Sequence, residues 1–189
     1  MGVEIRNTVL PSVLIIIPNR ISDQRGFFEE TWNSNELLDN GIDISFVQDN
    51  HSYSKDIATI RGLHYQSPPF AQDKLVRCTR GAIFDVAVDI RKGSPSYGEW
   101  IGVELSSDNG KQLLVPIGFL HGFITLSEDT EVQYKCSNYY SHEHDGSVCW
   151  SSCNINWPIP DGITPKISDK DGKAELFEKF KSPFVWEGN

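Results

Sequence analysis

Two short segments of the sequence contain the side chains best suited to acid–base or metal chemistry. Residues 61–66 include His64, and residues 116–123 include His121. A neutral imidazole accepts a proton near neutral pH and is also a common metal ligand. Lys74 follows the first segment, and its ammonium group only donates hydrogen bonds and repels a metal cation. The residue types alone therefore leave two kinds of site open, a metal centre and an acid–base site without metal.

The elements that must position these side chains are predicted to be short β-strands. Six segments are rich in Val, Ile, Phe and Tyr, and glycine-, proline- and asparagine-containing turns separate them. The predicted strands span residues 74–79, 82–90, 100–105, 112–116, 122–126 and 131–137. Many short strands at close spacing favour a sandwich or a barrel. Helices are predicted at residues 34–39, with Ser34 or Asn35 as the N-cap, and at residues 173–180.

The two histidine-containing segments resemble the signature stretches of the cupin superfamily. This resemblance implies a mainly β fold, a jelly-roll barrel with an N-terminal strand arm and a few short helices, formed as one domain by residues 1–189. In metal-binding cupins the first stretch supplies two histidines and a carboxylate, and the second supplies another histidine. Here Gln66 stands where the second histidine would be, and Lys74 lies near the carboxylate position. We therefore expect no metal and no cofactor.

A closer resemblance, to the dTDP-4-dehydrorhamnose 3,5-epimerase family, extends over residues 18–171. It depends on an ordered set of segments: residues 25–28, 46–52, 61–66, 72–77, 81–89, 118–123, 134–135 and 168–171. The resemblance implies an isomerase of dTDP-rhamnose biosynthesis. Such an enzyme converts dTDP-4-dehydro-6-deoxy-D-glucose to dTDP-4-dehydro-L-rhamnose, by removing and returning protons at C3 and C5 through an enolate.

The resemblance also implies a set of catalytic residues. His64 is the expected base, with Asp171 orienting its ring and stabilising the imidazolium. Tyr134 is the expected acid, because a phenol is protonated at neutral pH and can donate. Lys74 is expected to stabilise the enolate oxygen, as a cation fixed beside a developing negative charge does.

A larger set of residues is expected to hold the substrate. Arginine suits a pyrophosphate because its donors form a rigid fork, and aromatic and amide side chains suit a base and a sugar. The set comprises Arg25, Phe28, Glu30, Gln48, Asp49, Asn50, Arg61, His121, Tyr140, Asp145 and Lys170. In the family the segment that contains Arg25 reaches into the partner subunit's site. The resemblance therefore implies a homodimer that binds a nucleotide-sugar.

Composition and charge disfavour several other functions. The 189 residues carry a formal net charge of -9, which disfavours general binding to nucleic acid or to an anionic membrane. The longest apolar run, residues 13–17, is much too short to span a bilayer, and the N-terminus lacks a signal-peptide pattern. The 4 cysteines suggest no disulfide framework, so we expect reduced thiols and a cytoplasmic protein.

Some departures from the family pattern leave alternatives open. Asp145 replaces the usual glutamate, and residues 141–153 are atypical for the family. This segment contains two histidines and two cysteines, but their spacing fits no standard zinc motif. The alternatives are an epimerase that inverts only C3 or only C5, a sugar-binding cupin without catalysis, and a metal-dependent cupin enzyme.

Overall fold

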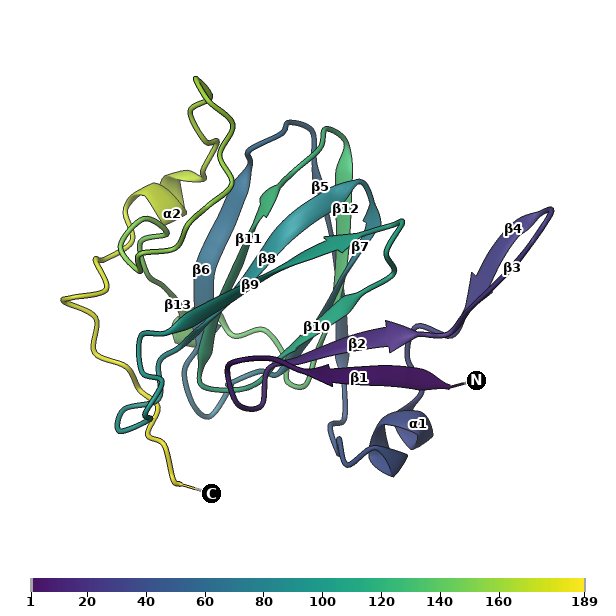
Figure 1. The fold of residues 1–189 in the computed structure, drawn as a ribbon. Helices are drawn as coiled ribbons and strands as arrows, with labels where there is room; N and C mark the ends of the chain where they lie inside the picture. Colours follow the sequence, from purple (N-terminus) through teal and green to yellow (C-terminus); the bar gives the residue numbers. More distant parts are fainter. Residues whose placement is uncertain (1, 189) are drawn as a thin grey trace.

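In the computed structural model, which describes residues 2–188, two antiparallel β-sheets face each other around the core (Figure 1). The larger sheet consists, in spatial order, of β1 (Val3–Asn7), β2 (Leu14–Pro18), β10 (Gln112–Val115), β7 (Lys74–Arg80), β12 (Thr130–Cys136) and β5 (Gln48–Ser54). The smaller sheet consists of β13 (Asp145–Ser147), β6 (Ile60–Gln66), β11 (Phe119–Thr125), β8 (Ala82–Asp89) and β9 (Trp100–Ser106). This architecture confirms the predicted mainly β jelly roll.

Alternation along the strands produces two buried layers, one on each face of the smaller sheet. On β8, Ile83 and Ala87 pack between the sheets, whereas Val86 and Val88 pack on the outer face. Side chains of a strand point alternately to its two faces, so a strand with both faces covered is apolar throughout. The C-terminal part of the chain covers the outer face and contributes Phe180 to that layer.

All six strands predicted from the sequence are present, with small shifts of their bounds. The largest shift concerns β11, which begins at Phe119 rather than at residue 122. Gly122 lies inside this strand because β6 approaches it closely. A Cβ atom at Gly122 would lie 2.7 Å from the carbonyl oxygen of Arg61. Gly122 therefore allows the two strands to approach closely and is not the first residue of a strand.

The first predicted helix is present as α1 (Ser34–Asp39), but its predicted cap was wrong. The N-cap is Asn33, whose side-chain oxygen accepts hydrogen bonds from the backbone N–H groups of Asn35 and Glu36. Asn33 has extended backbone angles and therefore lies just outside the helix, as a cap residue does.

The second predicted helix, over residues 173–180, was wrong. A short helix, α2 (Asp169–Gly172), ends before it. Glu175 forms a parallel bridge with Val148, and its carbonyl accepts a hydrogen bond from the backbone N–H of Cys149. These tertiary contacts, together with the burial of Phe180 on the smaller sheet, hold the segment in an irregular path.

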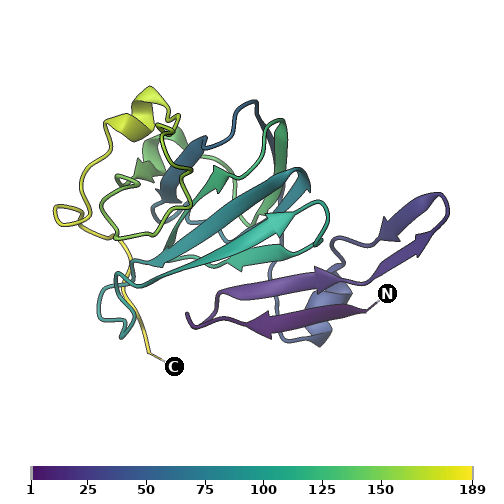
Figure 2. The same cartoon turned by 45° about the horizontal axis from the view of Figure 1, so that its top comes forward.

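The N-terminal part of the chain includes an arm that projects from the two sheets (Figures 1 and 2). The arm is a hairpin of β3 (Arg20–Asp23) and β4 (Gly26–Glu29), which pair only with each other. Of the residues that the structure describes, none forms a helix long and apolar enough to cross a membrane.

Candidate active site

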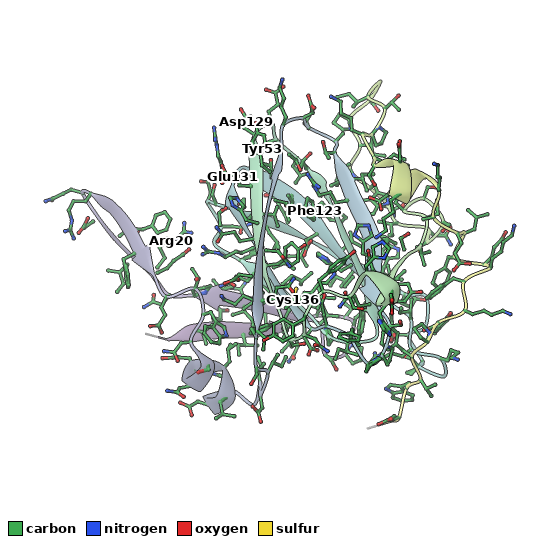
Figure 3. The ribbon with its side chains drawn as sticks, turned by 180° about the vertical axis from the view of Figure 1, so that it is seen from behind. Arg20, Tyr53, Phe123, Asp129, Glu131 and Cys136 are labelled. Atoms are coloured by element: carbon green, nitrogen blue, oxygen red, sulfur yellow. The ribbon has the colours of Figure 1, made fainter. Side chains whose placement is uncertain are left out.

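A cavity of about 490 Å³ opens between the two sheets. Residues of β5, β6, β7, β11 and β12 line its walls, together with residues 166–171. Figure 3 shows Phe123, one of the lining residues, between the sheets. The lining includes these predicted site residues: Arg61, His64, Lys74, His121, Tyr134, Lys170 and Asp171.

Two histidines of the smaller sheet lie on one wall of this cavity. β6 and β11 pair with His64 opposite His121. Their neighbours Leu63 and Leu120 belong to the outer apolar layer, so the alternation of each strand directs the histidines to the cavity. The Nε2 atom of His64 lies 2.6 Å from Oδ1 of Asp171.

The short helix α2 holds Asp171 beneath His64. Ser168, the N-cap of this helix, accepts a hydrogen bond from the backbone N–H of Asp171 at 3.1 Å. Burial opposes ionisation of the Asp171 carboxyl, but the hydrogen bond with His64 and further hydrogen bonds outweigh it and lower its pKa. Asp171 is therefore an anion at neutral pH and can orient the His64 ring.

A lysine and a tyrosine occupy the facing wall, on the larger sheet. Lys74 begins β7 and Tyr134 lies on the adjacent strand β12. Among residues 2–188, neither the Lys74 ammonium nor the Tyr134 hydroxyl has a hydrogen-bond or ion-pair partner. Burial lowers the pKa of Lys74 and raises that of Tyr134. The tyrosine therefore stays protonated, and no carboxylate among the described residues forms an ion pair with Lys74.

Two further cations stand at the edge of the cavity. Arg61 is held by hydrogen bonds to Ser54 Oγ at 3.1 Å and to the carbonyl of Tyr53 at 2.9 Å. The Lys170 ammonium donates to Oδ2 of Asp145 at 2.5 Å. Tyr140 donates to the same carboxylate oxygen at 3.1 Å. Tyr140 and Asp145, both predicted site residues, are therefore connected to the cavity through Lys170.

The predicted amide residues lie on the edge strand beside this group. Gln48 donates to Asn50 Oδ1 at 3.1 Å, and Asn50 donates to the sulfur of Cys136 at 3.5 Å. Asp49, between them, is exposed and pairs with Lys135 at 2.9 Å. Gln48, Asp49 and Asn50 do not line the cavity.

The remaining predicted residues lie on the arm or next to it, away from the cavity of their own chain. Arg25 forms an ion pair with Asp23 in the turn of the hairpin. Phe28 is 62% exposed, and Glu30 accepts a hydrogen bond from Asn33. None of these three residues lines the cavity of its own chain.

One residue of the site was missed by the sequence reasoning. Asp85 is fully buried, and its Oδ1 atom lies 2.8 Å from Nε2 of His121. Its other oxygen has no partner among the described residues. The sequence does contain a signal for Asp85. It is a carboxylate two residues from both Ile83 and Ala87, so the alternation of β8 directs its side chain between the sheets, as it does theirs.

Gln66, at the position of a metal-binding histidine in other cupins, binds backbone groups here. The Gln66 side chain donates to the carbonyls of Phe70 and Tyr139, and it accepts from the backbone N–H of Ser141. Across residues 2–188, no three His, Cys, Asp or Glu side chains are grouped so that they could hold a metal ion.

The fold and the cavity together define a class of protein. It is a cupin-type barrel in which a histidine of one sheet, paired with an aspartate of α2, faces a lysine and a tyrosine of the other sheet. The family described as dTDP-4-dehydrorhamnose 3,5-epimerase matches residues 7–179. The chain belongs to this family, which confirms the resemblance found in the sequence.

Individual relatives agree with this assignment. A dTDP-4-dehydrorhamnose 3,5-epimerase from Sinorhizobium fredii is 51% identical over 164 residues, which cover 86% of this chain and 83% of the relative. The crystal structure of dTDP-6-deoxy-D-glucose-3,5-epimerase RmlC from Legionella pneumophila, in complex with dTDP-4-keto-L-rhamnose, is 39% identical. It covers 99% of this chain and 100% of its own, with a TM-score of 0.93. The structure of a 3'-monoepimerase from Streptomyces bikiniensis in complex with dTDP-quinovose is 31% identical, with a TM-score of 0.83. The match covers 89% of this chain and 85% of that one.

Proposed function

We propose that this protein is a dTDP-4-dehydrorhamnose 3,5-epimerase. It converts dTDP-4-dehydro-6-deoxy-D-glucose to dTDP-4-dehydro-L-rhamnose, a step of dTDP-rhamnose biosynthesis. One observation carries the mechanism: His64, paired with Asp171 of α2, faces Tyr134 and Lys74 of the other sheet across a cavity large enough for a sugar.

His64 is the base in this proposal. Its imidazole removes the proton from the carbon beside the 4-keto group, first at one carbon and then at the other. The carboxylate of Asp171, 2.6 Å from Nε2, holds the ring in place and stabilises the imidazolium that forms. His121, paired with the buried Asp85, lies next to the base and contacts the sugar.

Lys74 stabilises the enolate oxygen. Removal of the carbon proton moves negative charge onto the 4-keto oxygen, and the ammonium group of Lys74 lies at that oxygen. Because Lys74 has no carboxylate partner among residues 2–188, its charge is free to interact with the enolate. A fixed donor of this kind contributes about 3 kcal/mol to transition-state stabilisation in other enzymes.

Tyr134 returns a proton on the opposite face of the sugar. Inversion requires removal from one face and return from the other, and the two sheets supply those two faces. Its phenol is protonated at neutral pH and carries no hydrogen bond to other described residues. This separation of acid and base is what distinguishes inversion from simple proton exchange.

The remaining predicted residues hold the nucleotide. Arg61 and Lys170 bind the pyrophosphate, and the Gln48–Asn50 pair and Tyr140 bind the base and deoxyribose. Arg25, Phe28 and Glu30 act in the cavity of a partner subunit, since none of them lines the cavity of its own chain. The active form is therefore a homodimer, and its reduced cysteines suit the cytoplasm.

Incubation with dTDP-4-dehydro-6-deoxy-D-glucose in heavy water tests the proposal. Solvent deuterium should enter at both C3 and C5, and the product should have both centres inverted. Label and inversion at one carbon alone would instead support the alternative of a monoepimerase, which one structural relative represents. If neither carbon gained deuterium, the proposed epimerase would be contradicted and the alternative of a sugar-binding protein without catalysis would be supported.

A further inference from the structure

Gln66 uses nearly all of its hydrogen-bonding capacity on the backbone of two loops, one that follows β6 and one that follows β12. The residue ends β6 and is only 6% exposed. Its Nε2 donates to the carbonyl of Phe70 at 2.7 Å and to that of Tyr139 at 3.1 Å, while Oε1 accepts from the N–H of Ser141 at 2.7 Å. The amide therefore connects two loops that are distant in sequence.

A second glutamine, Gln48, binds the backbone of Tyr140, which lies between Tyr139 and Ser141. The Oε1 atom of Gln48 accepts from the backbone N–H of Tyr140 at 2.9 Å. Gln48 belongs to the larger sheet and Gln66 to the smaller one. The backbone of residues 139–141 is thus held from both sheets, at three successive residues.

The held segment carries a side chain that reaches the cavity's charged edge. Tyr140 is 56% exposed, and its hydroxyl donates to Asp145, the same carboxylate that binds Lys170. An exposed tyrosine has several rotamers and little packing of its own to select one. Its direction therefore depends on the position of the backbone from which it projects and on its hydrogen bond to Asp145.

We infer that Gln66 is a positioning residue, which aims Tyr140 at the nucleotide by fixing residues 139–141. This inference rests on the proposed function, because it assigns the nucleotide to the edge formed by Tyr140, Asp145 and Lys170. The position that supplies a metal ligand in metal-binding cupins supplies an amide here, and the amide organises the binding site through the backbone. Gln66 acts without touching the reacting atoms.

The test compares two variants of Gln66 with the wild type in the full-length protein. Gln66→Met keeps the volume and removes all three hydrogen bonds, whereas Gln66→Glu keeps the acceptor for Ser141 and repels the two carbonyls. Titration with dTDP should give a Kd raised about tenfold for Gln66→Met, which corresponds to about 1.4 kcal/mol. The KM for the dTDP-sugar should rise in parallel, and kcat should change less than about threefold.

Gln72→Met is the matched control. Gln72 also donates to a backbone carbonyl of this region, that of Asn138 at 2.7 Å, but it makes no contact with residues 139–141. Its Kd for dTDP should stay within about twofold of the wild type. Equal losses in Gln72→Met and Gln66→Met would overturn the inference, since they would indicate general loosening.

A double-mutant cycle with Tyr140→Ala identifies the route of the effect. If Gln66 acts through Tyr140, Gln66→Met should raise the Kd less than about twofold in the Tyr140→Ala background. A full tenfold effect in that background would contradict the inference.

Hydrogen exchange separates failure of the inference from failure of the proposed function. In ligand-free protein, Gln66→Met should speed exchange of the Tyr140 and Ser141 amides, and Gln72→Met should not. Unchanged exchange overturns the inference whatever the protein binds. If Gln66→Met exchanged faster but the wild type bound no dTDP, the proposed function would be refuted. The conclusion that Gln66 fixes residues 139–141 would still stand.

Discussion

The side chains of this site differ mainly in whether their charge is already neutralised. His64 and His121 are each paired with a buried carboxylate, Asp171 and Asp85. Lys74 faces them without any such partner among the described residues. Burial of an uncompensated charge is unfavourable for folding, and such residues commonly occur at functional sites. Two predictions follow from individual side chains.

Tyr134→Phe should separate proton exchange from inversion. The substitution keeps the aromatic ring and removes only the phenolic hydroxyl, the proton donor in the proposed mechanism. His64 would still remove and return protons on its own face, so substrate should gain deuterium from heavy water with unchanged configuration. Mass spectrometry and NMR of the recovered sugar measure both quantities. Normal inversion by this variant would mean that another group is the acid.

Lys74→Met should abolish most activity without weakening the fold. We expect kcat to fall about 100-fold, in line with the loss of one oxyanion donor. Burial places the folded-state pKa of Lys74 below its unfolded value, so the full penalty for burying the ammonium applies below the folded-state pKa. That penalty disappears as the pH rises through the folded-state pKa towards the unfolded-state value.

Urea unfolding of Lys74→Met and the wild type at several pH values measures this second effect. At neutral pH the variant should be at least as stable as the wild type, and its advantage should decrease at alkaline pH. A variant that is much less stable at neutral pH would show that Lys74 has a structural role.

At the scale of elements, the site depends on how closely β6 and β11 approach. A Cβ atom at Gly62 would lie 2.6 Å from the Cα of Gly122, and one at Gly122 would lie 2.7 Å from the Arg61 carbonyl. These two glycines bring the strands together one or two residues from His64 and His121. The same pairing sets the spacing of the two histidines on their wall.

Gly122→Ala should therefore damage both stability and activity. The added methyl group must displace backbone atoms of β6, and overpacking of this kind costs about 1–3 kcal/mol. Gly172→Ala is the control, because a Cβ there would meet only the Ile167 side chain at an ordinary 3.5 Å. Urea unfolding should show a loss for the first variant and no loss for the second. Equal stabilities would mean that β6 can shift freely.

At the scale of the whole molecule, the arm exposes apolar side chains that its own chain does not cover. Ile21, Phe27 and Phe28 on the hairpin are 54%, 56% and 62% exposed. An exposed apolar patch on a projecting element is typical of an interaction surface. In the proposed homodimer these side chains would be covered, and Arg25 would complete the partner's cavity.

Complementation between two inactive variants should test this arrangement. Arg25→Ala lacks the arm contact, and His64→Asn lacks the base but keeps a donor for Asp171. If the arm acts on the partner, a mixed dimer has one intact site, so random mixing should restore about a quarter of wild-type activity at low substrate concentration.

The control for this experiment is each variant mixed with itself. If the arm acted within its own chain, no mixture would recover activity. A monomer by light scattering at assay concentrations would equally contradict the proposed dimer.

The sequence by itself determined the elements whose signals are local. Segments rich in Val, Ile, Phe and Tyr, separated by turn residues, located the six strands, because both signals are local and need no distant partner. The types and order of His64, Lys74 and Tyr134 pointed to the family, and Gln66 removed one expected metal ligand. Residues 34–39 have their own helical signals and formed the predicted helix.

Only the tertiary structure decided the features that join distant segments. The family resemblance implied the pairing of Asp171 with His64, which are 107 residues apart. The pairing of Asp85 with His121 depends on the register of β8 and β11 and was not predicted. Residues 173–180 do not form a helix because their neighbours draw Glu175 and Phe180 onto the smaller sheet. Contacts between segments far apart in the chain outweigh local propensity, since burial and backbone pairing contribute more free energy than helix preference does.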